Sequence, residues 1–275
     1  MNETAAKRTL YVLGGVFLVV FTLAPFAWML LVSITSRPDF LISGEIKYTL
    51  DNYINVLTDS SLHFTDYFFN SLIISLITSV AVTLFACCAG YAVSRLAFPG
   101  RILVPVGVLA LSMFPPISIV GYLYRIFAET GLLNTHAALV LPYTALTVPL
   151  ALWITMSYFS QIPVELDKAA LIDGAGRLTI LVKIVFPLAL PGIFSSFLLV
   201  FIACFNEFLL AVMLTIDYRA QTLPVGIALF QGIHGEIPWG NLMAASALTA
   251  VPLVALTIIF QKYIVQGLVG GAVKG

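Results

Sequence analysis

The chain has 275 residues, of which 60% are hydrophobic and only 9% are charged. Soluble domains carry about 25% Asp, Glu, Lys and Arg, so this composition excludes a soluble protein of this length and indicates that apolar surface faces lipid. The formal net charge is zero, which excludes a global basic or acidic surface for nucleic acid or another strongly charged partner.

Six uncharged runs predict membrane-spanning helices, because each exceeds the roughly 20 residues that cross a hydrocarbon core about 30 Å thick. These runs cover residues 10–36, 67–94, 102–124, 137–164, 184–206 and 237–261. A seventh uncharged run, 220–235, contains Pro224 and several glycines, so we expect it to be an interfacial segment rather than a span. The short alternating strands of a membrane barrel are absent, and the expected fold is therefore all-α.

The first run is either a signal peptide or an uncleaved span. Lys7 and Arg8 precede it, as basic residues precede the apolar core of a signal peptide. Its apolar core is longer than the roughly 7–15 residues of such a peptide and no clear cleavage site follows, which favours an uncleaved span. Of the 13 Lys and Arg residues, nine then lie on the side of both termini and four on the other side. Because cytoplasmic loops hold the excess, we expect both termini to be cytoplasmic, segment 37–66 to be an external loop, and residues 1–275 to form one membrane domain.

Prolines interrupt two of the predicted spans. Met113-Phe114-Pro115-Pro116 lies in the third, and Pro142 and Pro149 lie in the fourth. Proline removes a backbone donor and clashes with the preceding turn, and such kinks are tolerated where they are buried in protein or face water. The kinks therefore mark either a substrate path or a feature of helix packing.

The cysteines and histidines do not predict a metal site. Their spacing matches no ligand pattern, and we expect the cysteines, which all fall within predicted spans, to be packing residues, namely Cys87, Cys88 and Cys204. The histidines are scattered over predicted external segments at His63, His136 and His234.

Residues 163–176, PVELDKAALIDGAG, bring charge together in the middle of an apolar chain. Pro163 suits a first helical position, and acidic residues near it suit the positive end of a helix dipole. Asp173-Gly174 predicts the end of the helix, because glycine readily takes the left-handed conformation of a C-cap. A helix of about ten residues is only ~15 Å long and is marginal in water. Either something holds it, or the stretch is a solvated loop.

This stretch resembles the cytoplasmic coupling loop of ABC importer permeases, which usually reads E-A-A, three residues, G, nine residues and I-x-L-P. Ala169-Ala170, Gly174, Ile184 and Pro187 match that pattern, whereas lysine stands where its glutamate is expected and Phe186 replaces its leucine. The resemblance implies a coupling loop over residues 163–185. It also implies that an ATPase contacts Glu165, Asp167, Lys168, Ala169, Ala170, Asp173, Gly174 and Arg177.

Three further segments resemble carbohydrate permeases of the same family, of the maltose/trehalose type and its G-type subunit. They are Asn70-Ser71-Leu72, FNEFLLA at 205–211 and the tail QKYIVQGLVGGAVKG at 261–275. The resemblance covers roughly residues 65–275. It implies a type I ABC importer permease fold in a prokaryotic cell membrane.

The same resemblance implies a set of partners. These are a sister permease, expected to be a different chain in a heterodimer, an ATPase dimer that binds ATP and Mg, and an external binding protein or lipoprotein that delivers a sugar such as a disaccharide. The sequence lacks the G-x-x-x-x-G-K-[ST] phosphate loop, so we expect no cofactor on this chain and no enzymatic activity of its own. A permease for another small solute, an ATP-independent carrier and a membrane-embedded enzyme are the alternatives.

Polar and aromatic residues within the spans are candidates for the substrate path. Glu207 and Asn206 could bind sugar hydroxyls, because an intramembrane charge usually faces a cavity or a partner. Alternatively, Glu207 pairs structurally, with Arg219 or with the sister subunit. Sugar sites need aromatic platforms beside polar groups, and the aromatic candidates are Tyr122, Tyr124, Tyr143 and Trp153.

Overall fold

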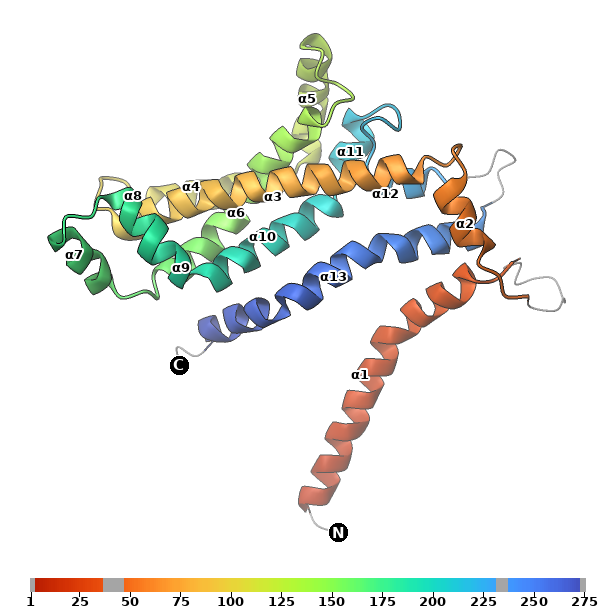
Figure 1. Ribbon diagram of the computed structural model, residues 1–275, viewed down its shortest axis with the longest axis horizontal. Helices are drawn as coiled ribbons and strands as arrows, with labels where there is room; N and C mark the ends of the chain where they lie inside the picture. The colour runs from red at the N-terminus through yellow and green to blue at the C-terminus, as the bar shows by residue number, and fades with distance from the viewer. Residues whose placement is uncertain (1–2, 37–46, 231–236, 273–275) are drawn as a thin grey trace. The chain divides into compact units, whose positions relative to one another are not determined.

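The computed structural model describes residues 3–36, 47–230 and 237–272 (Figure 1). The chain divides into two compact units, one made of Met1–Phe64 with Ile227–Val251, the other of Thr65–Gly226 with Pro252–Gly275. Each unit is described on its own below.

The first unit is organised around Asn52. It contains α1 (Glu3–Ser33), α2 (Asp51–Thr58) and the beginning of α13 (Trp239–Ala272). Nδ2 of Asn52 donates to the backbone oxygens of Ser33, at 2.8 Å, and Thr35, at 3.0 Å. A Cβ at Gly240 would lie 2.6 Å from that same Nδ2, so glycine is needed for the close approach of α13 to α2.

Three helices form the centre of the second unit, namely α3 (Phe64–Arg95), α6 (Ala137–Phe159) and α10 (Leu190–Phe205) (Figure 1). Oγ1 of Thr155 donates to the backbone oxygen of Ala86 at 3.1 Å, and a Cβ at Gly90 would lie 2.9 Å from Thr155 Oγ1. A Cβ at Gly192 would overlap the ring of Tyr158. Small residues thus allow α6 to lie close to both neighbours, as is usual for helices in a membrane.

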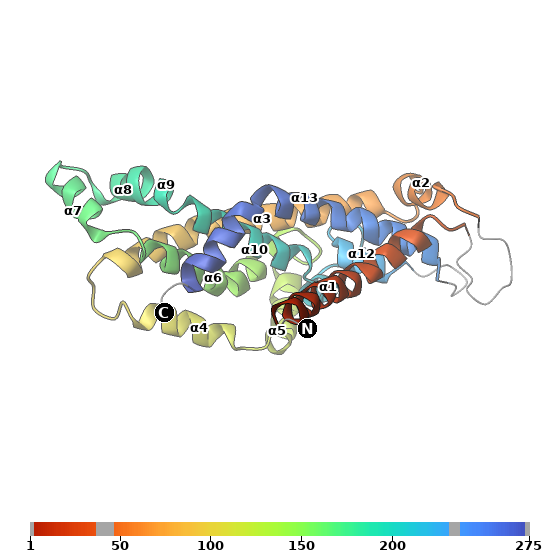
Figure 2. The same ribbon diagram turned by 90° about the horizontal axis from the view of Figure 1, so that it is seen from below.

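The third predicted span is broken rather than kinked. It consists of α4 (Leu103–Ser112) and α5 (Ile117–Glu129), which meet at 88° across the Met113–Pro116 segment. The double proline explains the break, because neither proline can donate a helical hydrogen bond. Figure 2 shows α4 lying along α6, against which it packs. Pro142 and Pro149, in contrast, lie inside one continuous α6.

Among the described residues, four helices are long and apolar enough to cross a membrane without a break, and they cover Leu10–Ser33, Phe64–Arg95, Ala137–Phe159 and Trp239–Gln261. A second bend, of 81°, separates Arg177–Leu188 from Leu190–Phe205. The all-α prediction is confirmed, and the number of spans reaches six if each bent pair counts as one. The predicted fifth span, 184–206, contains this bend, since its straight helix starts at Leu190.

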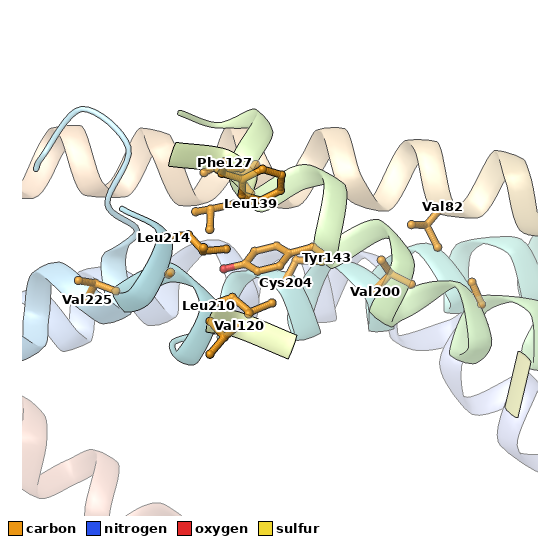
Figure 3. Packing of buried hydrophobic residues seen from close by; sticks show 14 of the residues in the cluster. Val82, Val120, Phe127, Leu139, Tyr143, Val200, Cys204, Leu210, Leu214 and Val225 are labelled. Atoms are coloured by element: carbon orange, nitrogen blue, oxygen red, sulfur yellow. The ribbon is translucent and has the colours of Figure 1, made fainter. Parts of the chain in front are cut away.

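Two apolar clusters among the described residues lie in the core of the second unit. One joins α3, α5, α6, α10, α11 (Leu209–Leu214) and α12 (Leu223–Ala228), and Figure 3 shows its central residues. Within run 220–235, Leu223 and Val225 are buried, and Gly226 packs beneath the ring of Tyr67. As predicted, the described part of this run forms no spanning helix, since α12 has six residues, and it is packed against the protein.

Candidate functional site

The charged stretch at 163–176 forms the short helix α7 (Val164–Ile172). Pro163 is extended, with ψ at 131°, so the helix begins one residue later than predicted. The predicted C-terminal stop is confirmed, since Gly174 has φ at +83°. Its amide donates to Leu171 O at 3.1 Å and the amide of Ala175 donates to Ala170 O at 2.9 Å. This pair of bonds is the Schellman arrangement that closes a helix.

The inner face of α7 is packed against the second apolar cluster. Ala170 is buried there with Phe159, Ile180 and Val185. The cluster includes residues of α3, α6, α8 (Arg177–Ile180), the π-helical turn Leu181–Val185 and α9 (Phe186–Leu188). This packing supplies the stabilisation that so short a helix lacks in water, and α7 is therefore a fixed helix rather than a solvated loop.

A buried charge pair also lies on the inner face of α7. Nε of Arg95 and Oδ2 of Asp167 are 4.0 Å apart, and the two side chains are 2% and 4% exposed. Nη2 of Arg95 donates to the backbone oxygens of Phe159 and Ile162, each at 2.5 Å. Asp167 was expected to contact an ATPase, but in this structure its carboxylate faces Arg95 inside the chain.

The outer face of α7 and the residues that follow it are exposed. Of the residues predicted to contact an ATPase, those that lie on this surface are Glu165, Lys168, Ala169, Asp173, Gly174 and Arg177. Two apolar side chains, Ile172 at 85% exposed and Leu178 at 71%, share it and were missed by the motif comparison. The sequence could have indicated them, because each is an apolar residue next to a charged one, Asp173 or Arg177. The surface therefore combines charged and apolar contacts.

The predicted path residues Tyr143 and Glu207 are joined to each other. The hydroxyl of Tyr143 donates to Oε2 of Glu207 at 2.6 Å, and the amides of Leu210 and Ala211 donate to the same carboxylate at 2.8 Å and 3.2 Å. Glu207 thus caps the first turn of α11. It pairs structurally, as one of the two readings held, but through Tyr143 and these amides rather than through Arg219.

The other path candidates have different surroundings from Tyr143. Tyr143 is buried, and Figure 3 shows its ring within the apolar cluster. Tyr122 on α5 is 69% exposed, Trp153 on α6 is 62% exposed, and Tyr124 and Asn206 are also exposed. The side chains of these four residues are accessible within this chain, whereas Tyr143 supports the backbone beside Asn206 through its bond to Glu207.

The side chains of Asn70 and Asn134 hold the loop at 215–222 by hydrogen bonds. Nδ2 of Asn70 donates to the backbone oxygens of Tyr218 and Gln221, at 2.8 Å and 3.0 Å. Oδ1 of Asn134 accepts from the amide of Ile216 at 2.8 Å, and its Nδ2 donates to Oδ1 of Asp217 at 3.0 Å. This hydrogen bond from Asn134 holds the pKa of Asp217 below its ordinary value. The Asn-Ser-Leu segment is therefore explained by its role in fixing the loop at 215–222.

The cysteines and histidines of the described residues do not gather into a metal site, since no group of three or more His, Cys, Asp or Glu side chains there could hold an ion. His136 uses Nε2 to bond Oδ1 of Asn70 at 2.8 Å, and His234 lies outside the described residues. Cys87 and Cys204 are buried as predicted, but Cys88 is exposed, so packing within this chain does not explain it.

Comparison with known proteins agrees with this architecture. Residues 83–270 match the family described as binding-protein-dependent transport system inner membrane component. The trehalose/maltose transport system permease protein MalG of Thermococcus litoralis is 52% identical, with 100% of each chain covered. The trehalose transport system permease protein SugB of Mycobacterium tuberculosis is 37% identical, with 98% of this chain and 99% of the relative covered.

A solved chain has the same fold. It comes from the crystal structure of a bacterial ABC transporter involved in the import of the acidic polysaccharide alginate, and it superposes with a TM-score of 0.76 at 20% identity. The superposition covers 96% of this chain and 98% of the other. Matches along the whole length to two transport permeases, together with this fold, lead to one conclusion: the chain belongs to the family of binding-protein-dependent transport system inner membrane components.

Proposed function

We propose that the chain is the permease subunit of an ATP-driven sugar importer and forms half of its translocation path. The similarity to two relatives named for trehalose transport, at 52% and 37% identity along the full chain, supports a sugar as substrate and a disaccharide in particular. Exposed Tyr122, Trp153 and Asn206 are the residues proposed to face the path. The Tyr143–Glu207 hydrogen bond holds the backbone next to Asn206 in place.

The coupling role rests mainly on one observation, the short capped helix α7 with its inner face packed and its outer face exposed. A separate ATPase binds ATP and Mg and receives this outer face in a surface cleft. Ile172 and Leu178 supply the apolar contact, because exposed apolar residues on a rigid element typically mark a protein interface. Lys168 stands where the family motif has glutamate, so the partner surface opposite it carries an acid or a hydrogen-bond acceptor.

The remaining partners follow from the same assignment. Both termini and α7 lie on the cytoplasmic side, as the distribution of Lys and Arg indicates. A second, different permease chain completes the path, and an external binding protein delivers the sugar. This chain binds neither nucleotide nor metal in the proposed cycle.

The proposal is tested with the chain reconstituted in proteoliposomes together with its sister permease, ATPase and binding protein, and with radiolabelled trehalose as the probe. We expect uptake that requires the binding protein and that requires ATP on the side of the membrane where the ATPase is bound. Uptake without ATP would indicate a secondary carrier, and ATP hydrolysis without uptake of trehalose or maltose would indicate a different solute.

The coupling surface is tested by Ile172→Asp, which places a charge in the proposed apolar contact. We expect loss of co-purification with the ATPase and at least a tenfold drop in uptake. Ile216→Asp is the matched control, since Ile216 is also an exposed isoleucine but lies in the loop fixed by Asn134. Normal ATPase binding by the Ile172 variant would contradict the assignment of α7.

A further inference from the structure

Arg95 joins three helices at the α7 end of the second unit. It is the last residue of α3, and its side chain is 2% exposed. Arginine and aspartate are almost never fully buried unless they are paired. The buried position of Arg95 and Asp167 therefore requires specific partners, and these define the Arg95 cluster: the two side chains and the backbone oxygens of Phe159 and Ile162.

The two backbone oxygens of the cluster belong to the end of α6. Phe159 is its last residue, and Ile162 lies in the short link to α7. The last carbonyl groups of a helix have no partner within the helix. The guanidinium bonds the oxygen of Ile162 and adds a second bond to the oxygen of Phe159, which also accepts from the Ile162 amide at 3.3 Å. A guanidinium donates in several fixed directions, whereas a lysine ammonium is a single point charge. Arginine is thus suited to bind α6 and face α7 at once.

The half of the cluster that faces α7 is the weaker half. The Nε–Oδ2 separation of 4.0 Å exceeds the ~2.7–2.9 Å of a charge-assisted hydrogen bond. Nε of Arg95 and Oδ1 of Asp167 are buried and make no hydrogen bond within the part of the chain that the structure describes. Arg95 is therefore hydrogen-bonded to the end of α6 and to the link that leads into α7, and it is held to α7 itself by charge.

We infer that Arg95 and Asp167 are positioning residues that transmit a shift of α7 to the ends of α3 and α6. This inference rests on the proposed function of α7 as the helix that contacts the ATPase. The surrounding contacts of Ala170, Ile180 and Val185 are apolar, and apolar attraction is non-directional, so those residues alone set no register. The Arg95 cluster adds two directional hydrogen bonds to the end of α6 and a charge pair to α7 at the same point.

The first test compares the number of sugars imported per ATP hydrolysed, measured in the reconstituted complex with trehalose as the probe. Asp167→Asn keeps the size of the side chain but removes the charge that faces α3. We expect this ratio to fall at least tenfold while the ATPase remains bound, and Arg95→Lys to give a smaller fall. Matched controls are Asp51→Asn and Arg101→Lys, both at exposed residues, for which the ratio should stay within twofold of wild type.

A second variant separates positioning from stability. Removing both members of a buried ion pair avoids the cost of leaving one charge unpaired, and a glutamine amide can still donate to the carbonyl oxygens at the end of α6. Arg95→Gln combined with Asp167→Leu should therefore insert and assemble in normal amounts. We still expect a low ratio of sugar to ATP for this double variant. A wild-type ratio in the double variant or in Asp167→Asn would overturn the inference.

A third measurement does not depend on any sugar. Spin labels at exposed Val164 of α7 and exposed Ile77 of α3 report the distance between the two helices in the assembled complex. We expect one narrow distance distribution in the wild type, before and after ATP is trapped with vanadate, and a broadened one in Asp167→Asn. Equal widths would overturn the inference. Failure of the wild type to import sugar would instead count against the proposed substrate alone.

Discussion

The hydroxyl of Tyr143 lies 2.6 Å from Oε2 of Glu207, and this hydrogen bond connects α6 to the first turn of α11. An acidic residue inside an apolar segment usually belongs to a site or to a partner. Here two backbone amides and one tyrosine hydroxyl use its oxygens. Glu207 thus acts as a structural centre beside Asn206, one of the residues proposed to face the path.

Removing the Tyr143 hydroxyl should therefore lower stability more than it lowers substrate affinity. For Tyr143→Phe we expect a loss of about 1–3 kcal/mol, because the carboxylate is left with an unfilled bond. Thermal unfolding in detergent measures the loss. Tyr122→Phe is the control. Because Tyr122 is exposed, the free energy of unfolding of this variant should differ from wild type by less than about 0.5 kcal/mol. A larger effect on sugar KM than on stability would place Tyr143 in the substrate site instead.

The end of α7 depends on the backbone conformation of Gly174. Its φ of +83° disfavours every side chain, although a Cβ there would meet nothing within 4 Å. Gly174→Ala should cost about 1–2 kcal/mol through backbone strain alone and should increase hydrogen exchange in α7. Gly176→Ala is the matched control, since Gly176 has φ at −71° and also has open space. Equal exchange in the two variants would show that the left-handed turn is not needed.

The contact between Gly192 and the Tyr158 ring should not tolerate a larger residue. A Cβ at Gly192 would overlap the ring, and overpacking of this kind typically costs about 1–3 kcal/mol. We expect Gly192→Ala to lower the unfolding temperature and the yield of inserted protein. Gly107→Ala in α4 meets nothing within 4 Å, and it should leave both unchanged. The prediction fails if the two variants have the same unfolding temperature.

The Asn134–Asp217 hydrogen bond predicts a pH dependence at low pH. The pKa of Asp217 is lowered, mainly by the bond from Asn134, from an ordinary value of 3.8. A carboxyl with a lowered pKa stabilises the fold above its ordinary pKa, and that contribution is lost as the pH falls through the lowered value. Asp217→Asn should therefore unfold at a lower temperature than wild type at neutral pH, and the difference should shrink below pH ~3.8. A difference that is constant with pH would exclude this mechanism.

Features set by neighbouring residues could be predicted from the sequence, and features set by distant residues could not. The stop at Gly174 follows from local backbone preferences, and so does the disturbance of the third span by Pro115-Pro116. The inward direction of Asp167 depends on Arg95, which belongs to another helix, so a motif comparison placed Asp167 on the wrong surface. The bend before Leu190 was missed because Pro187 and Pro191 also suit the beginning of a helix.

Composition predicted the apolar spans but not the packing within them. Pro224 and the glycines at 220–235 predict that this run is no span, but they do not predict that Gly226 allows α12 to pack beneath Tyr67. Likewise, nothing in the uncharged run around Cys87 and Cys88 distinguishes the buried cysteine from the exposed one. Such assignments require the rotation of each helix about its axis, which is fixed by contacts between helices.

The carbonyl groups bound by Arg95 also constrain the order in which the chain folds during its synthesis. Its acceptors lie 64 and 67 positions later in the chain, so a nascent chain that has not yet inserted α6 holds an arginine at the end of α3 with no acceptor. The surface proposed to contact the ATPase is therefore completed only after α6 has been synthesised. Partly made permeases should then be unable to capture an ATPase, which would keep unfinished chains out of the assembled transporter.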